Sequence, residues 1–515
     1  MRTGASDFLG RFGLALMAGL AHAASIATPW NGQPAWWLQL AALAALAALL
    51  QRSASSREAA VLGWGFAWAW LSGTFWWLFV SMHTYGGLPA ALAVIAVLAL
   101  AGVLALYYGV ISALYKRCAA LPAWTHPGVF AALWLAAELA RGLWFTGFGW
   151  GGAGYAHVDG PLSAYAPWTG AYGVAALAAA VAMGLSQGWR LGRWAAGVLI
   201  VLLALPSGVA PLMTEVTRSR GELTVALLQG NIPQDEKFQP GSGVAQALRW
   251  YGEQLGRPQA PLLIAPETAI PLLPDQLPTG YWDELAQRYS ASQQAALIGV
   301  PWGNLQQGYT NSVLGLAPGL STPWRYDKHH LVPFGEFIPT GFKWFTELMN
   351  IPLGDFRRGA LGQPGFEWQG QRLAAHVCYE DLFGEELAMQ FRDPAKAPTV
   401  LVNVSNIAWF GNTVAIDQHL SISRMRALEL ARPVVRATNT GATVIIDHRG
   451  HVQAALPRHT RGVLLGQVEG REGLTPYACW VSRLGLWPLW LVSGGVVLLA
   501  AGGRRRRAGA GLDVR

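Results

Sequence analysis

The stretch RLAAHVCYE, residues 372–380, is a short apolar run that ends in a cysteine, a tyrosine and a glutamate. Apolar runs of this length that stop at turn residues are typical of buried strands. Eight further runs of this kind begin from Leu223 onward: LTVALLQGN, PLLIAPETA, AALIGVPWG, NSVLGLAPG, PTVLVNVSN, RPVVRATNT, ATVIIDHRG and GVLLGQVEG. Helical patterns separate several of them, at residues 242–255, 280–294 and 415–432. This alternation predicts a buried α/β sheet arrangement.

Three of the strand ends carry side chains with complementary chemistry. Glu267 follows the run LLIAP, Lys328 follows TPWRYD, and Cys378 follows RLAAHV. In α/β sheets, active sites usually form at strand ends. A glutamate can take the proton of a thiol, while a lysine lowers the thiol pKa and stabilises an oxyanion. The alternative is that Cys378 is a small buried hydrophobe, as lone cysteines usually are. Spacing alone leaves both interpretations open.

The cysteine pattern argues against disulfides and metals. The chain has only three cysteines, which are too scattered for a disulfide framework: Cys118, Cys378 and Cys479. The sequence contains no CxxC or HExxH motif, the spacings that mark common metal sites. We therefore expect no structural metal, and we assign no role to Cys118 or Cys479.

The composition is that of an integral membrane protein, because 52% of the residues are hydrophobic and only 13% are charged. A helix of about 20 apolar residues crosses a bilayer core. Runs that approach this length lie near residues 9–28, 35–51, 60–80, 88–115, 127–145, 165–187, 193–213 and 484–502. The sequence thus predicts about eight membrane helices. The expected domains are a seven-helix membrane domain at 1–214, an extramembrane catalytic domain at 215–480, and a final helix with a basic tail at 481–515.

The basic residues of short loops predict the orientation, because they gather on the cytoplasmic side of membrane proteins. With eight helices drawn, they fall on one side: Arg2, Arg11, Arg52, Arg57, Lys116, Arg117, Arg190, Arg193 and Arg504–Arg507. Both termini are therefore predicted to be cytoplasmic, and the domain at 215–480 to lie outside. Topology also explains the net charge of +8, so we expect no nucleic-acid partner. The last arginine run fits stop-transfer or contact with anionic lipid.

One charged pair is predicted within the membrane. Glu138 and Arg141 lie three residues apart in the fifth apolar run, so they share a helix face and can pair. Charges inside a membrane are functional candidates, but such a pair can also serve only to orient the next loop. That loop, GLWFTGFGWGGAGYAHVDGP, is rich in glycine and aromatic residues. It is either a wall of a lipid-facing active site or an interfacial loop, and the sequence favours neither.

Several segments resemble the nitrilase superfamily: LLQGNIPQDEKF, APETAIP, YDKHHLVPFGEFIP, HVCYEDLF, NVSNIAWFGNT and RALELARPVVRATNTGATVIIDHRG. Joined to a multi-span membrane domain, they are similar to the apolipoprotein N-acyltransferase family of Gram-negative bacteria over essentially the whole chain. The resemblance implies an extramembrane α-β-β-α sandwich attached to an α-helical membrane domain. It also implies a Glu-Lys-Cys triad, which falls on Glu267, Lys328 and Cys378.

The resemblance further implies supporting or substrate-binding roles for Glu336, Tyr379 and Glu380. Glu336 would orient Lys328 or act as a second carboxylate, and the alternative is a loop carboxylate paired with a neighbouring base. Glu380 would shape the pocket with Tyr379, or it would only cap the following helix. Phe238 stands where the family usually has tryptophan, so an aromatic wall is expected without the indole N–H.

The activity implied by the resemblance is N-acylation of the α-amine of the lipid-modified N-terminal cysteine of apolipoproteins, in lipoprotein maturation. The acyl donor would be a phospholipid, and the resemblance suggests phosphatidylethanolamine. The acyl group would be carried as a thioester on Cys378. The expected partners are thus the phospholipid, the diacylglyceryl apolipoprotein and the lipid bilayer, with no cofactor. The expected location is the bacterial inner membrane, with a periplasmic catalytic domain and a monomeric enzyme.

Two other functions fit parts of the pattern. A membrane-anchored amidase or nitrilase would use the same triad and pass the acyl group to water or ammonia, although placement beside lipid argues against it. A transporter or binding protein whose outer domain has lost its chemistry would not need the triad. Three asparagines that also end strands are expected to bond loop backbone, with pocket lining as the alternative: Asn403, Asn406 and Asn439.

Overall fold

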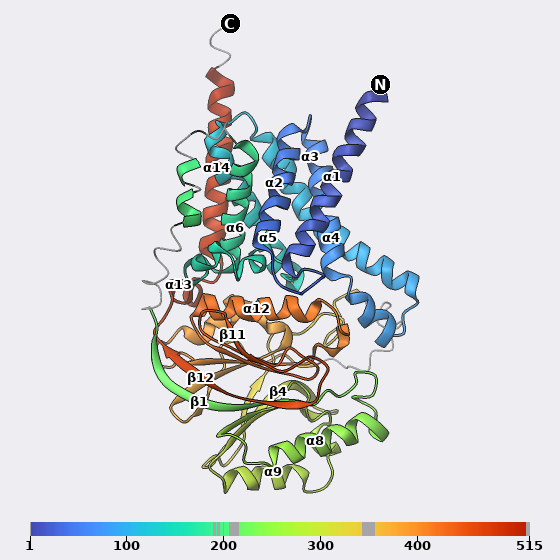
Figure 1. The fold of residues 1–515 in the computed structure, drawn as a ribbon, viewed down its shortest axis with the longest axis vertical. Coiled ribbons are helices and arrows are strands. Elements are labelled where there is room, and N and C mark those ends of the chain that lie inside the picture. Colours follow the sequence, from blue (N-terminus) through green and yellow to red (C-terminus); the bar gives the residue numbers. More distant parts are fainter. Residues whose placement is uncertain are drawn as a thin grey trace. The chain divides into compact units, whose positions relative to one another are not determined.

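The computed structural model of the chain describes residues 2–188, 192, 196–198, 200–204, 216–341 and 356–510 (Figure 1). The chain divides into two compact units. The first unit comprises Met1–Trp76, Ala91–Thr214 and Leu484–Arg515, and the second comprises Trp77–Ala90 and Glu215–Arg483. The predicted membrane helix at 193–213 lies largely outside the described residues.

The first unit is helical. Its long helices are α1 (Arg2–Ile26), α2 (Trp36–Arg52), α3 (Ser56–Phe75), α4 (Ala90–Arg117), α5 (His126–Leu143), α6 (Ala166–Gln187) and α14 (Trp487–Ala510). Each coincides with one of the predicted apolar runs. The start of α3 shows how the sequence sets a boundary: the Ser55 side chain accepts from the Glu58 N–H, and Glu58 accepts from the Ala54 N–H at 2.7 Å, a reciprocal cap.

Fewer helices than predicted have the length and apolarity that a membrane span needs. Among the described residues four qualify: Ser6–Ile26, Ala90–Arg117, Ala123–Thr146 and Pro161–Gln187. A fifth candidate is the pair Pro476–Leu484 (α13) and Trp487–Gly502, which is bent by 90°. The helix α2 has 17 residues, so it is only about 26 Å long, less than the bilayer core of about 30 Å. The predicted number of eight is therefore approximate.

The predicted pair of Glu138 and Arg141 is present, and both side chains are buried. Arg141 Nη2 lies 3.4 Å from Glu138 Oε2, and Tyr108 donates to Glu138 Oε1 at 2.6 Å. Arg141 Nη1 donates to the carbonyls of Phe148 and Trp150, each at 2.8 Å. Buried charges persist when they are paired and hydrogen-bonded. These bonds support the interpretation that the pair holds the glycine-rich loop after α5.

The second unit contains two six-stranded sheets (Figure 1). The first has the order β12-β1-β2-β3-β4-β5, with β1 (Arg218–Gln229), β2 (Leu262–Ile264), β3 (Ala295–Asn304), β4 (Gly308–Leu316), β5 (Trp324–Asp327) and β12 (Gly462–Glu472). The second has the order β11-β10-β9-β8-β7-β6, with β6 (Phe366–Trp368), β7 (Gln371–Val377), β8 (Val400–Ser405), β9 (Val434–Thr438), β10 (Val444–Ile446) and β11 (Val452–Ala455). In each sheet the three central strands β1-β2-β3 or β7-β8-β9 are parallel.

The core lies between the two sheets, and alternation along each strand explains why. Val225 and Leu227 of β1 belong to the cluster shared with the second sheet. Ala226 and Leu228 belong to the cluster under α8 (Ala245–Leu255) and α9 (Tyr281–Ser290). Side chains of a strand point alternately to its two faces, so each strand contributes to both layers. The helix α12 (Ala415–Leu430) packs on β9 of the second sheet. The predicted α-β-β-α sandwich is confirmed.

All nine predicted strand segments contain a strand, and the three predicted helices correspond to α8, α9 and α12. The segment TPWRYD, the strand predicted before Lys328, contains β5. The sequence interpretation missed β6 and β11, which have three and four residues. Both lie at a sheet edge and include exposed residues, so they do not appear as continuous apolar runs.

The segment Trp77–Ala90 packs with the second unit, although the predicted boundary at residue 214 placed it in the membrane domain. Trp77 Nε1 donates to Gln418 Oε1 at 2.9 Å, and its ring lies 4.3 Å from that of Phe410. The ring of Tyr85, at the end of the one-turn helix Val80–Tyr85, lies 6.0 Å from Trp409. Aromatic contacts thus attach this segment to the short 3-10 helix Ile407–Phe410, and one buried hydrogen bond attaches it to α12.

Candidate active site

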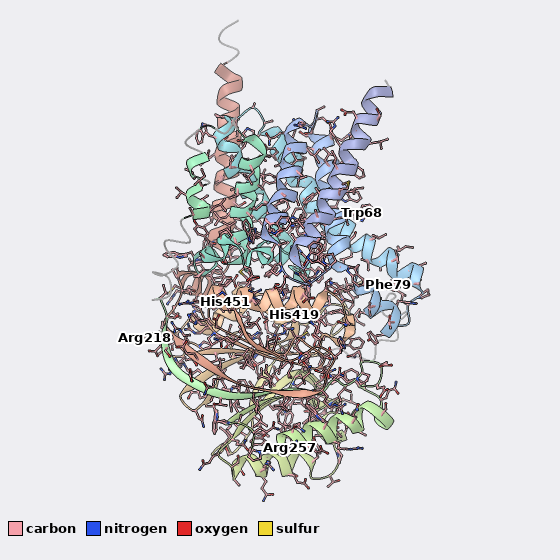
Figure 2. The ribbon with its side chains drawn as sticks, in the orientation of Figure 1. Trp68, Phe79, Arg218, Arg257, His419 and His451 are labelled. Carbon is pink, nitrogen blue, oxygen red and sulfur yellow. The ribbon has the colours of Figure 1, made fainter. Side chains whose placement is uncertain are left out.

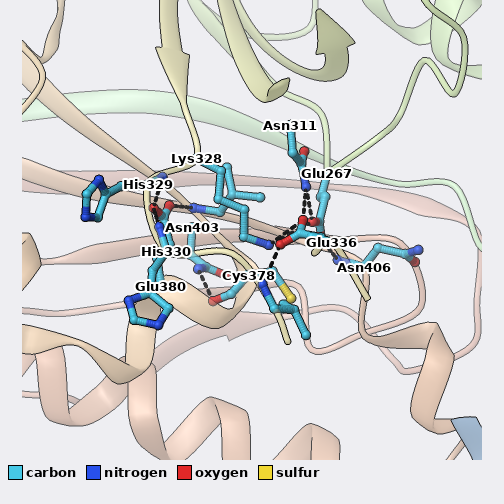
Figure 3. A network of polar contacts seen from close by, with 12 residues as sticks. Glu267, Asn311, Lys328, His329, His330, Glu336, Cys378, Glu380, Asn403 and Asn406 are labelled. Atoms are coloured by element: carbon cyan, nitrogen blue, oxygen red, sulfur yellow. Dashed lines mark hydrogen bonds and ion pairs between the residues drawn. The ribbon is translucent and has the colours of Figure 1, made fainter. Parts of the chain in front are cut away.

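The three predicted catalytic side chains come together where the two sheets meet. Glu267 follows β2 and Lys328 follows β5, both in the first sheet, while Cys378 follows β7 in the second. Lys328 Nζ lies 3.5 Å from Glu267 Oε1. Figure 3 shows these side chains pointing toward one another, and the charges of Glu267 and Lys328 both act on the Cys378 thiol. The site is therefore built from strand ends, as the pattern indicated.

Glu267 is buried and surrounded by hydrogen-bond donors. Asn311 Nδ2 donates to Glu267 Oε1 at 2.7 Å, and the Asn406 N–H donates to Glu267 Oε2 at 2.8 Å. Lys328 is the third donor group nearby. An ionised carboxylate is an acceptor only, so these donors hold both oxygens of Glu267 in place.

The loop that carries Glu267 leaves no room on one side. A Cβ added to Gly299 of β3 would lie 2.7 Å from Glu267 Cα, and closer still to the Pro266 carbonyl. We expect Gly299→Ala to displace Glu267, to lower any catalytic activity that depends on this side chain at least about ten-fold, and to cost about 1–3 kcal/mol of stability. Activity and thermal unfolding would be compared with Gly462→Ala on β12, where the added Cβ makes an ordinary contact at 3.6 Å. Full activity in Gly299→Ala would contradict this account.

Lys328 is only 1% exposed and lies between two carboxylates. Its Nζ donates to Glu336 Oε1 at 2.8 Å, and that same oxygen accepts from Asn311 Nδ2 at 2.7 Å. Burial lowers the pKa of Lys328, but Glu336 and then Glu267 outweigh it and raise the pKa well above its ordinary value. Lys328 therefore stays an ammonium. These contacts support the interpretation that Glu336 orients Lys328.

Cys378 sits at the turn from β7 into the short 3-10 helix η9 (Cys378–Leu382) with a φ of 52°. A non-glycine residue in this left-handed region is strained by about 1–3 kcal/mol, and such residues gather at functional sites. Burial and the Glu267 charge raise the pKa of the Cys378 thiol to about 12, against the opposing effect of Lys328. The thiol is thus protonated near neutral pH, and it needs a base to become a nucleophile.

Glu380 forms hydrogen bonds to both sheets next to Cys378. It accepts from the Val377 N–H at 2.6 Å and the Tyr326 hydroxyl at 2.9 Å, and also from the His329 N–H at 2.7 Å. The first bond is the predicted cap of the helix after Cys378, and the other two reach β5 and the residue after Lys328. Glu380 thus holds the turn at Cys378 against the strand end that carries Lys328.

Two aromatic residues lie near the site as predicted. The ring of Tyr379 is buried and packs at 5.3 Å against that of Phe383. Phe238 is partly buried and stacks on Trp409 at 6.5 Å, so the position is part of an aromatic pair, although Phe238 itself has no indole N–H. The adjacent Lys237 was not anticipated. It is buried, it donates to the Glu267 carbonyl at 3.1 Å, and burial lowers its pKa to about 7.

Asparagines complete the polar network. The sequence interpretation missed Asn311, because nothing in the run NSVLGLAPG marks its first residue as a bridge between two carboxylates. The β4–β5 pairing places it there, since the Lys328 N–H donates to the Asn311 carbonyl at 2.8 Å. Asn406, expected to bond loop backbone, uses its side chain to contact Gln234 and Asn439 at 2.9 and 3.1 Å.

Residues 224–477, which form the sandwich and carry Glu267, Lys328 and Cys378, match the carbon-nitrogen hydrolase family of enzymes. A solved carbon-nitrogen hydrolase from Helicobacter pylori is similar to 52% of this chain and 94% of its own, with 15% identity and a TM-score of 0.35. Residues 18–184 match the apolipoprotein N-acyltransferase N-terminal domain.

Relatives with a curated function extend the match to nearly the whole chain. The apolipoprotein N-acyltransferase of Verminephrobacter eiseniae is 57% identical, covering 92% of this chain and 92% of its own. That of Ralstonia nicotianae is 45% identical, covering 96% of this chain and 94% of its own. This chain belongs to the apolipoprotein N-acyltransferase family. It is therefore a membrane enzyme of acyl transfer in lipoprotein maturation.

Proposed function

We propose that the enzyme transfers an acyl chain from a phospholipid to the α-amine of the lipid-modified N-terminal cysteine of an apolipoprotein. The proposed phospholipid donor is phosphatidylethanolamine. The acyl group is carried as a thioester on Cys378. The observation that carries this proposal is the arrangement of a buried ammonium and a buried carboxylate 3.5 Å apart at a cysteine held in a left-handed turn. A base, an oxyanion partner and a nucleophile are thus available together.

In the first step, Glu267 takes the proton of the Cys378 thiol, and the thiolate attacks the ester carbonyl of the phospholipid. The oxyanion that develops is stabilised by the ammonium of Lys328. The C–O bond then breaks, and Glu267 returns its proton to the departing alkoxide. The products are a thioester and a lysophospholipid.

In the second step, the neutral α-amine of the apolipoprotein attacks the thioester carbonyl, and Glu267 takes a proton from the amine nitrogen. The tetrahedral intermediate breaks its C–S bond, and the Cys378 thiolate regains a proton from Glu267. The product is an amide and the enzyme is restored. A thiolate leaves readily, which makes a thioester suitable for transfer to an amine.

A membrane-embedded enzyme fits these substrates because both carry acyl chains and reach the site by lateral diffusion. The proposed topology has both termini in the cytoplasm and the sandwich in the periplasm of the inner membrane, which follows from the basic short loops. The membrane domain is proposed at 1–214, the catalytic domain at 215–480 and the last helix at 481–515. The proposed working form is a monomer, and the chemistry uses only the side chains of this chain.

The test is the intact mass of the detergent-purified enzyme after incubation with phosphatidylethanolamine. A gain of one acyl chain that is removed by hydroxylamine, and that is absent in Cys378→Ala, is the expected result. Cys118→Ala and Cys479→Ala serve as controls and should acquire the same adduct. Release of lysophospholipid without any adduct would favour rapid hydrolysis and the amidase alternative. Full adduct formation in Cys378→Ala would exclude Cys378 as the acyl carrier.

A further inference from the structure

A buried polar cluster lies beneath the nucleophile turn and takes no part in the proposed reaction. Its members come from β7, η9, α12 and β9, and all are fully or almost fully buried: His376, Asp381, His419, Ser423 and Arg436. We call this set the polar floor. Figure 2 shows His419 on α12. So many polar groups in a dry interior are costly unless each has a defined partner.

Arg436 organises the polar floor. Its Nη1 lies 3.3 Å from Asp381 Oδ2 and donates to Ser423 Oγ at 2.7 Å. Its Nη2 lies 2.8 Å from His419 Nδ1. A guanidinium is only a donor, so His419 Nδ1 must accept. The proton of the neutral imidazole is therefore on Nε2.

The Nε2–H of His419 is directed at the backbone carbonyl of Cys378. His419 Nε2 lies 3.2 Å from the carbonyl oxygen of Cys378, to which Asn403 Nδ2 also donates at 3.4 Å. Cys378 is the residue with the strained φ of 52°. Because a peptide group is planar, fixing this carbonyl also fixes the direction of the Tyr379 N–H. Backbone N–H groups next to a nucleophile commonly serve as oxyanion donors.

We propose that His419, oriented by Arg436, is a positioning residue for Cys378: its Nε2–H holds the Cys378 carbonyl and so maintains the left-handed turn that aims the thiol at Glu267 and Lys328. The proposal rests on the proposed role of Cys378 as nucleophile. It assigns His419 no contact with substrate. The strained backbone of Cys378 is maintained because two hydrogen bonds, from His419 Nε2 and from Asn403 Nδ2, hold its carbonyl in place.

The charges of the polar floor are compatible with this role. Burial and the Arg436 charge lower the pKa of His419 to about 3. Burial raises the pKa of Asp381, but His376, His419 and Arg436 outweigh it and hold that pKa well below its ordinary range. Asp381 and Arg436 thus form a neutral pair, and His419 stays a neutral imidazole whose Nδ1 accepts from Arg436 throughout the working pH range.

The test compares His419→Leu, which loses the donor, with His419→Gln, whose terminal amide N–H can replace Nε2–H. Both would be made in a Cys118→Ser/Cys479→Ser background so that Cys378 is the only thiol. The readouts are the rate of Cys378 alkylation by iodoacetamide between pH 6 and 9, the rate of thioester formation from phosphatidylethanolamine, and thermal unfolding. His157→Leu, which removes a buried histidine bonded to Gln39 in the first unit, controls for loss of stability alone.

For folded His419→Leu we expect alkylation and thioester formation to slow about ten- to a hundred-fold, with a changed pH profile of alkylation. His419→Gln should recover most of both rates, and His157→Leu should change neither. A folded His419→Leu with the wild-type rates and pH profile would overturn the proposal, as would a loss that His419→Gln shares in full. A wild-type enzyme that is alkylated at Cys378 but forms no acyl adduct would instead contradict the proposed function, independently of His419.

Discussion

Replacing Glu267 by glutamine is expected to lower acyl transfer about a thousand- to ten-thousand-fold, the upper range for loss of a general base, while the enzyme stays folded. The carboxylate acts in both steps of the proposed reaction, because it removes the thiol proton and later the amine proton. Without it, a Cys378 thiol whose pKa is raised to about 12 has no partner to ionise it. Thioester formation measured by intact mass should therefore fail together with turnover.

The glutamine also fits its surroundings poorly. In the native site, Glu267 Oε1 accepts from Asn311 and Oε2 accepts from the Asn406 N–H. Either orientation of the glutamine amide places its NH2 group against one of these donors. The resulting loss of stability should be modest, about 1–3 kcal/mol for one unsatisfied buried group.

Glu336→Gln is the matched control for Glu267→Gln. It makes the same change of a buried carboxylate next to the same lysine, since Lys328 Nζ lies 2.8 Å from Glu336 Oε1. We expect it to retain thioester formation at a reduced rate, because the base is still present. Rates that fall equally in both variants would mean that the total negative charge around Lys328 matters. They would exclude a general-base role that belongs to Glu267 alone. Activity in Glu267→Gln close to wild type would refute the assignment directly.

The strands and the three candidate site residues were accessible from the sequence because they are marked by local features. Nine apolar runs correspond to strands, since burial on both faces makes central strands continuously apolar. Glu267, Lys328 and Cys378 could be singled out because each is the reactive side chain directly after a predicted strand. The family resemblance then indicated which of the two interpretations of the cysteine to prefer, and spacing alone did not.

What the sequence did not reveal consists of contacts between distant segments. Asn311 bridges two carboxylates only because the β4–β5 register places it beside Lys328. The bond from His419 to Cys378 joins residues 41 positions apart. The left-handed φ at Cys378 is equally hidden, because cysteine has no preference for that region. The packing of Trp77–Ala90 with the second unit is likewise not visible in hydropathy, from which the boundary at residue 214 was predicted.

Replacing Lys328 by methionine is expected to abolish acyl transfer and also to destabilise the second unit by about 3–5 kcal/mol, the cost of breaking a buried ion pair. In the described part of the chain, the lysine is the only cation that pairs within 4 Å with the carboxylate oxygens of Glu267 or Glu336. Without it, two buried carboxylates accept from the same Asn311 Nδ2, each at 2.7 Å. One of them is then expected to take up a proton.

The pH range over which stability is lost should move down in this variant. In the wild type the raised pKa of Lys328 means that the ion pairs stabilise the fold below the ordinary lysine pKa and are lost only at strongly alkaline pH. In Lys328→Met the folded state holds a carboxyl proton that the unfolded chain releases above about pH 5. Its stability should therefore fall as the pH rises from 5 to 8, which thermal unfolding at several pH values would show.

The double variant Lys328→Met/Glu336→Gln separates stability from chemistry. It removes one of the two carboxylates, so we expect most of the lost stability to return and the pH dependence to flatten. Acyl transfer should stay absent, since no ammonium remains to stabilise the oxyanion. Recovery of activity together with stability would show that Lys328 serves the fold alone. A Lys328→Met variant that is as stable as the wild type at pH 8 would contradict the ion-pair geometry itself.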